Sequence, residues 1–234
     1  MTDELAMPEA QIQPQSLPFY EVWNIALRRP NLESYERLLQ DPNATFGRAA
    51  VWLLVVGAIS GLLSAASQLV WTQLMGSSAF SQFAGSGQAF APQLAPQGIS
   101  MVALMVCSIP ISAVGVLLGS IIYYGLINFT ASAFGGQGTF GQMMYINAAY
   151  YVPITLITSL LSLIPCLACL AAPLGIYAFA LQFLAVRAAS KLGWGGAIGS
   201  VLIVMFLFLL VGLVLALLVF VPLIDELRTA YPTL

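Results

Sequence analysis

Residues 49–70 read AAVWLLVVGAISGLLSAASQLV, and they open a stretch that contains no Asp, Glu, Lys, Arg or His as far as Val186. Arg48 and Arg187 bound this stretch. A soluble domain needs charged groups on its surface to stay dispersed in water. A charge at the centre of a bilayer instead costs about 2.5–3.5 kcal/mol. The stretch therefore predicts an integral membrane protein.

The composition of the whole chain agrees with this prediction. Of its 234 residues, 60% are hydrophobic and only 7% are charged, whereas about 25% are charged in an average soluble domain. The chain shows no basic patch that would bind nucleic acid, so we expect no nucleic-acid partner. Asp3 and Glu4 stand where a secretory signal peptide would carry basic residues, so we expect no signal peptide.

The region before the first span divides into two parts. Residues 1–18 are rich in Pro, Gln and Ala and predict a disordered N-terminal tail. Residues 19–48 predict two amphipathic helices, separated at Pro30, with Asn31 as the N-cap of the second. Both helices are too short and too polar to span a membrane. They lie either in the membrane interface or against other parts of the protein, and the sequence leaves both arrangements open.

A spanning helix needs about 20 apolar residues. This length predicts five transmembrane helices, preceded by the short amphipathic helices, and hence an all-α polytopic fold. Residues 72–99 are uncharged but rich in Gly, Ser, Gln and Pro, and they predict an extramembrane loop. Residues 100–110 predict a bent extension of the second span, although 100–134 is long enough to leave two spans open. The predicted spans are 49–70, 111–133, 142–164, 170–189 and 197–223, which make up a transmembrane domain of 49–223, followed by a short tail of 224–234.

Charge placement predicts the orientation. Arg28, Arg29, Arg37 and Arg48 all precede the first span, and positive residues favour the cytoplasmic side. We therefore expect a cytoplasmic N-terminus. With five spans, the turn that holds Lys191 also falls on the cytoplasmic side, and the C-terminus falls outside. The expected location is the inner or plasma membrane of a bacterium.

Three sequence features together resemble the YIP1-domain membrane proteins, particularly their bacterial members. They are the amphipathic segment WNIALRRP (23–30), the turn GGQGTF (135–140) and the segment AYYVP (149–153) in the span that follows. The resemblance covers nearly the whole chain from Phe19 to Leu223. It implies a five-span fold with a cytoplasmic N-terminus. Eukaryotic members act in vesicle traffic and bind small GTPases on their cytoplasmic side, but no GTPase-binding motif can be matched here residue by residue.

Two spans carry glycines four residues apart, Gly57 with Gly61 and Gly115 with Gly119. Small residues at this spacing flatten one side of a helix and let the backbone of a neighbouring helix approach. The pairs serve either contact between copies of the chain or packing within one copy. We favour packing within one copy, because five helices must pack together.

Cys166 and Cys169 form a Cys-x-x-Cys pair. Such a pair can form a disulfide or half of a zinc site. No His exists to complete a metal site, and Cys107 is the only further thiol. The alternatives are a local disulfide on the outer face and two small apolar residues in a turn, of which we favour the second. The sequence predicts no metal and no cofactor.

Uncharged polar residues gather near the cytoplasmic ends of three spans. Because membrane amides seek hydrogen-bond partners, we predict that they meet at one depth. They form either a structural hydrogen-bond network or a polar pocket for a lipid headgroup or a peptide. The predicted polar cluster consists of Asn128, Gln142, Asn147, Gln182 and Arg187.

These observations favour a non-enzymatic protein. The uncharged core lacks the bases that a nucleophile needs and the ionisable residues of coupled transporters. We expect a scaffold, trafficking or accessory-subunit protein that docks through its N-terminal helices and its outer loop. Its partners would be membrane lipids and other membrane proteins or further copies of itself. The alternative is a passive channel or transporter, or a lipid-handling protein. A lipid, quinone or pigment between the helices needs no sequence motif.

Overall fold

The computed structural model of the chain describes residues 16–83 and 101–230. Five of the described helices are long and apolar enough to cross a membrane, over Phe46–Val70, Val106–Ala133, Phe140–Leu161, Cys166–Ser190 and Trp194–Leu218. The all-α, five-span prediction is therefore confirmed. The elements are α1 (Phe19–Arg28), α2 (Leu32–Leu39), α3 (Phe46–Phe83), α5 (Met101–Ala133), α6 (Phe140–Leu161), the 3-10 helix η1 (Pro165–Leu170), α7 (Ala171–Ser190) and α8 (Trp194–Ala230).

Two predicted boundaries are corrected, and the predicted bent second span is one continuous helix. The predicted loop of 72–99 is helical from 72 to 83, since α3 continues to Phe83, and its remainder lies outside the described residues. Residues 101–133 form one helix with Pro110 inside it, so they are one span rather than two. The predicted tail of 224–234 is helical as far as Ala230. The predicted disordered tail lies outside the described residues, apart from residues 16–18.

The central helix of the bundle is α6. Every residue from Met143 to Tyr150 is buried, whereas an amphipathic helix would bury one face only. The helices α3, α5, α7 and α1 surround it. A helix buried on all sides fixes the positions of its neighbours, so α6 is the reference for the sites described below.

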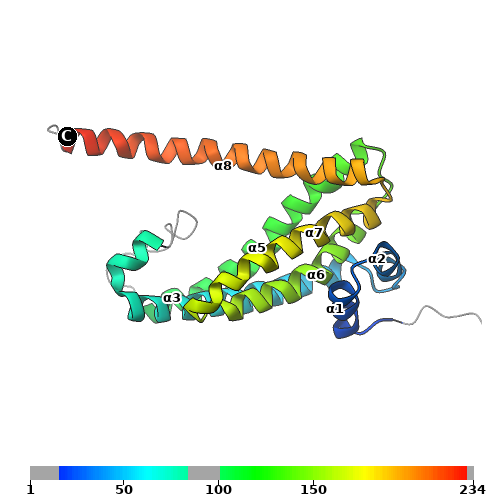
Figure 1. Cartoon of the computed structure of the whole chain (residues 1–234), viewed down its shortest axis with the longest axis horizontal. Helices are drawn as coiled ribbons and strands as arrows, with labels where there is room; N and C mark the ends of the chain where they lie inside the picture. The colour runs from blue at the N-terminus through cyan, green and yellow to red at the C-terminus, as the bar shows by residue number, and fades with distance from the viewer. Residues whose placement is uncertain (1–15, 84–100, 231–234) are drawn as a thin grey trace, which may run out of the picture.

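The two N-terminal helices cover one end of the bundle (Figure 1). Asn31 caps α2, since its Oδ1 accepts a hydrogen bond from the Ser34 N–H at 2.7 Å. The apolar faces are buried against α6 and α7, with Val22 and Tyr35 fully inaccessible. Phe19 and Tyr20 remain exposed. Of the two arrangements that the sequence left open, the inner faces thus pack on the protein itself.

The same end of the bundle carries the turn between α5 and α6. Gly135 adopts the left-handed conformation with φ 88°, and the Gly136 N–H donates to the Ala131 carbonyl at 2.9 Å, which closes α5 with a Schellman motif. The Gln137 N–H then donates to the Ser190 carbonyl at 3.0 Å. The turn is therefore fastened to the C-terminal end of α7.

The last helix, α8, runs away from the bundle (Figure 1). Its first turns pack on α5 and α7, where Ala197, Val201 and Val204 are buried. Beyond Val204, no described side chain of α8 is buried. The helix therefore has a packed N-terminal part and an unpartnered apolar part.

Candidate functional site

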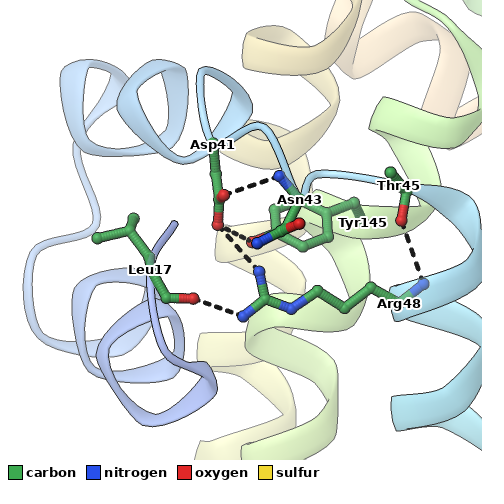
Figure 2. Close-up of polar contacts among 6 residues, drawn as sticks. All are labelled: Leu17, Asp41, Asn43, Thr45, Arg48 and Tyr145. Atoms are coloured by element: carbon green, nitrogen blue, oxygen red, sulfur yellow. Dashed lines mark hydrogen bonds and ion pairs between the residues drawn. The ribbon is translucent and has the colours of Figure 1, made fainter. Parts of the chain in front are cut away.

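A buried ion pair joins the N-terminal helices to the bundle (Figure 2). The Asp41 side chain is fully inaccessible, and its Oδ2 lies 3.0 Å from the Arg48 guanidinium. The Tyr145 hydroxyl of α6 donates to the same oxygen at 3.2 Å. The Asn43 N–H donates to Oδ1 at 2.8 Å, and Arg48 donates to the Leu17 carbonyl at 2.6 Å. One carboxylate thus links the α2–α3 turn, α3, α6 and, through Arg48, the segment that precedes α1.

Aromatic rings surround the guanidinium of Arg48. It lies 4.9 Å from the Trp52 ring centroid and 5.9 Å from that of Tyr145. Trp52 in turn contacts Trp23 of α1, with 6.0 Å between the ring centroids. A cation over an aromatic face is attracted by the ring quadrupole, more strongly where water is excluded. We define Asp41, Arg48, Trp52 and Tyr145 as the junction cluster.

The junction cluster is not among the sites expected from the sequence. Arg48 entered the prediction only as a positive residue before the first span, and Asp41 had no predicted role. The available signal was weak: an acidic residue in the Asp41–Pro42–Asn43 turn, seven positions before an arginine at the membrane boundary. Tyr145 could not be found in this way, because it is distant in the sequence.

Tyr35 of α2 fastens the two N-terminal helices to each other. Its hydroxyl donates to the Ala26 carbonyl of α1 at 3.2 Å. Burial raises the pKa of Tyr35 above its ordinary value, with a smaller contribution from Tyr177 in the same direction. The hydroxyl therefore stays protonated and keeps donating. Tyr177 of α7 donates to the Leu27 carbonyl at 2.5 Å and fastens α1 to the bundle.

The residues of the predicted polar cluster make separate contacts. Gln142 forms a capping box with Thr139 at the start of α6. Asn147 is fully buried, where it donates to the Met143 carbonyl at 2.7 Å and accepts from the Tyr150 hydroxyl at 2.9 Å. Among the described residues, no hydrogen bond joins two members of the predicted cluster.

The other three members lie on α5 and α7. Gln182 donates through Nε2 to the Tyr123 hydroxyl of α5 at 2.6 Å, a hydrogen bond that joins two spans. The Arg187 guanidinium lies 4.4 Å from the Trp194 ring centroid, at the turn into α8. Asn128 is half-buried on α5, and its backbone carbonyl accepts from Ser132.

A groove of about 400 Å³ lies between α5, α6 and α7. Gly115 and Gly119 of α5 and Gly175 of α7 line it, together with Tyr123 and Gln182. A Cβ added at any of these three glycines would meet nothing within 4 Å. The structure therefore brings one member of the predicted cluster, Gln182, to the wall of a cavity.

The two glycine pairs serve different purposes. A Cβ at Gly57 would lie 2.8 Å from the Cα of Ala113, so this glycine lets α3 and α5 approach closely. Ser112 of α5 donates to the Gly57 carbonyl at 2.7 Å, and its side chain fills the space beside Gly61. The first pair, Gly57 and Gly61, thus packs against α5 of the same chain, which is the alternative that we favoured. The second pair, Gly115 and Gly119, faces the groove instead.

The two cysteines of the Cys-x-x-Cys pair lie in η1, between α6 and α7. Cys166 and Cys169 are both exposed, and neither forms a disulfide in the structure. Together with Cys107, they are free thiols. In the structure, Cys166 and Cys169 are thus part of the short connection between α6 and α7.

Comparison with known proteins identifies the family. No curated protein and no solved structure matches the chain. The Yip1 domain matches residues 26–216, from α1 into the exposed part of α8. The match covers four spans in full and the fifth as far as residue 216, together with the α5–α6 turn, α2 and the end of α1. The chain therefore belongs to the Yip1 domain family of membrane proteins.

Proposed function

We propose that the protein is a non-enzymatic membrane scaffold or accessory subunit, and that it binds a transmembrane helix of another membrane protein along α8. The observation that carries this proposal is the unpartnered part of α8. From Leu209 to Leu218, beyond the contact of Phe208 with Tyr123, its side chains are exposed or half-buried. The first turns anchor the helix to α5 and α7, so its free part is held in a defined direction.

The free part of α8 carries a surface suited to another helix. Gly212 and Ala216 lie four residues apart, and a Cβ at Gly212 would meet nothing within 4 Å. Small residues at this spacing let two helix backbones approach, and dispersion and weak hydrogen bonds then stabilise the pair. The equivalent surface at Gly57 is already filled by α5. Gly212 and Ala216 define the docking surface of α8.

The N-terminal helices supply a second surface, at the end of the bundle that we propose to be cytoplasmic. Arg28, Arg29 and Arg37 are exposed there, together with Glu21 and Asn24 around a hollow of about 260 Å³. Each basic residue near an anionic leaflet contributes about 1 kcal/mol to membrane association. These arginines would hold α1 and α2 against anionic lipid and so orient α8 in the bilayer.

A lipid-handling function is the second candidate. The groove between α5, α6 and α7 favours it, since its size falls in the range of about 300–1,000 Å³ that is usual for small-molecule sites. This candidate needs no partner on α8. The two functions are therefore separable by variants placed on different helices.

Native purification in mild detergent, with mass spectrometry of the co-eluting proteins, tests the scaffold proposal. We expect a stoichiometric membrane-protein companion, which the double variant Gly212→Leu/Ala216→Leu loses. Gly195→Leu is the matched control, because a Cβ at Gly195 also meets nothing within 4 Å. A solitary chain, a homo-oligomer, or a companion that is retained by the double variant would contradict the proposal.

A further inference from the structure

The groove between α5, α6 and α7 has an apolar floor and a polar end. We call the part that is lined by the exposed Gly115, Gly119 and Gly175 the floor, and the buried Ser120 also lines the groove. At the polar end stand the hydroxyl of Tyr123 and the amide of Gln182, which are bonded to each other at 2.6 Å. A ligand in this groove is thus apolar along most of its length and polar at one end.

The depth of the polar end excludes a charged headgroup. At about 1.5 Å per residue, Gln182 lies about 12 Å from the end of α7 at Ser190, and Tyr123 lies about 15 Å from the end of α5 at Ala133. Half of the hydrocarbon thickness of a bilayer is about 15 Å. The polar end therefore sits close to the middle of the membrane, and none of the residues that line the groove is charged.

The groups at the polar end can donate to a neutral acceptor. The Tyr123 hydroxyl accepts its bond from Gln182, so its own proton is available for a ligand oxygen. The Tyr150 hydroxyl, by contrast, already donates to Asn147. An ester or phosphate of a bilayer lipid stays at the interface and would not reach Tyr123. A neutral carbonyl group that resides near the middle of the membrane would reach the Tyr123 hydroxyl.

The walls at the polar end suit a flat ring. Tyr123 of α5 lines the groove, and it also contacts Phe208 of α8, which is not among the lining residues, edge-to-face with 5.6 Å between the ring centroids. Phe179 of α7 lines the groove on the other helix and contacts Phe183 with a centroid separation of 4.7 Å. Aromatic rings arranged edge-to-face leave faces on which a further ring can stack.

From this geometry we infer that the groove binds an isoprenoid quinone, or a lipid of the same chemistry, with a flat neutral ring that carries carbonyl oxygens and a long apolar chain. The ring lies beside Tyr123 and Phe179, where one carbonyl accepts from the Tyr123 hydroxyl. The first units of the chain lie over Gly115, Gly119 and Gly175. The inference concerns binding alone and does not depend on a partner for α8.

Retention of decylubiquinone by the full chain in phospholipid nanodiscs tests this inference. After gel filtration, the quinone is extracted and quantified against empty nanodiscs, which report simple partitioning into lipid. We expect about one decylubiquinone per chain above that background, reached at a saturating concentration. Gly119→Phe and Gly175→Phe fill the floor and are expected to lower the retained excess at least about tenfold. The matched control Gly195→Phe, outside the groove, should retain as much as the wild type.

A second pair of measurements isolates the polar recognition. Tyr123→Phe is expected to weaken decylubiquinone binding by about fivefold, the effect of one neutral hydrogen bond. It should leave the binding of decylbenzene, which has no carbonyl, unchanged. Decylubiquinone retention no greater than in empty nanodiscs would overturn the inference. Retention that is the same in Gly119→Phe as in the wild type would also overturn it. Co-purified phospholipid that Gly119→Phe removes, without any decylubiquinone excess, would assign the groove to an acyl chain and equally overturn it.

Discussion

At the scale of single residues, the Asp41 carboxylate determines how the N-terminal helices are held. A buried charge is stable only where it is paired and hydrogen-bonded. Asp41 has Arg48 at 3.0 Å, the Tyr145 hydroxyl and a backbone N–H. Because these groups come from different segments, the position of each segment depends on the others.

Arg48→Leu should therefore destabilise the protein strongly, because it leaves the Asp41 charge buried without its partner. Breaking a buried pair in this way costs about 3–5 kcal/mol. The free energy of unfolding in mixed micelles, measured by titration with a denaturing detergent, checks this value. The double variant Asp41→Asn/Arg48→Leu should recover most of the loss, since neither charge remains. Equal stabilities of the wild type and Arg48→Leu would refute the role given to the pair.

Glycines that look alike in the sequence should respond differently to substitution. Gly61→Leu must displace the Ser112 side chain and separate α3 from α5, and overpacking of this kind costs about 1–3 kcal/mol. Gly115→Leu enters open space and gains helix propensity, so its thermal unfolding midpoint should equal or exceed that of the wild type. Thermal unfolding of both variants in one detergent compares them directly. A similar loss in both would show that the two glycines have the same environment.

The amides show where reasoning from sequence ends. From the sequence, we expected Asn147 and Gln182 to need hydrogen-bond partners in a membrane. The sequence did not identify the partners, because a side chain in a helix can also bond to groups three or four residues away. Asn147 does so with the Met143 carbonyl and with Tyr150. Of these two amides, Gln182 bonds to another span, through Tyr123 of α5. The rotation of α5 that places Tyr123 opposite Gln182 cannot be predicted from the sequence of either helix.

At the scale of elements, the five spans could be predicted because the bilayer sets both their length and their composition. The ends of α3 and α8 could not. Charged residues near position 225 end the apolar run of α8 but not its backbone hydrogen bonding. In α3, Gly76 and its serine neighbours lower helix propensity, yet no proline stands between Val70 and Phe83 to stop propagation from the preceding turns.

The extension of α3 predicts a helical pattern in residues 72–83. Spin labels placed singly at these positions should show accessibility to a lipid-soluble relaxant that varies with a period of about 3.6 residues. The labels are attached to cysteine in a variant that lacks the three native cysteines. An accessibility profile that is flat, or that lacks this period, would contradict the helical extension of α3 and support the loop that the sequence predicts.

At the scale of the whole molecule, one end of the bundle carries the N-terminal helices and the turns that follow α5 and α7. The N-terminal helices, the α5–α6 turn and the end of α7 meet there, through contacts such as that of Gln137 with Ser190. The arginines that precede α3 and the Lys191 turn belong to this end. Positive charge on one side of five spans is the basis for the proposed cytoplasmic N-terminus.

Single cysteines at Ser34 and Lys191 test that orientation, again without the native cysteines. Lys191 is exposed in the structure, and Ser34 is half-buried. A membrane-impermeant thiol reagent should label both only after the cells are permeabilised, because both belong to the end that we propose to be cytoplasmic. Labelling of Lys191→Cys in intact cells would contradict the proposed orientation, and labelling of only one of the two would contradict the five-span topology.

The central claim is that α8 is a docking helix, and photocrosslinking in the native membrane tests it most directly. A benzophenone amino acid is placed at Leu209, which is 60% exposed and lies one turn from Gly212 on the same side of α8, and for comparison at Ile122 of α5, which is 57% exposed. We predict a discrete adduct with another membrane protein from position 209, lost in Gly212→Leu/Ala216→Leu, and lipid adducts alone from position 122. Lipid adducts alone from both positions, or an adduct with a second copy of the chain, would contradict the claim.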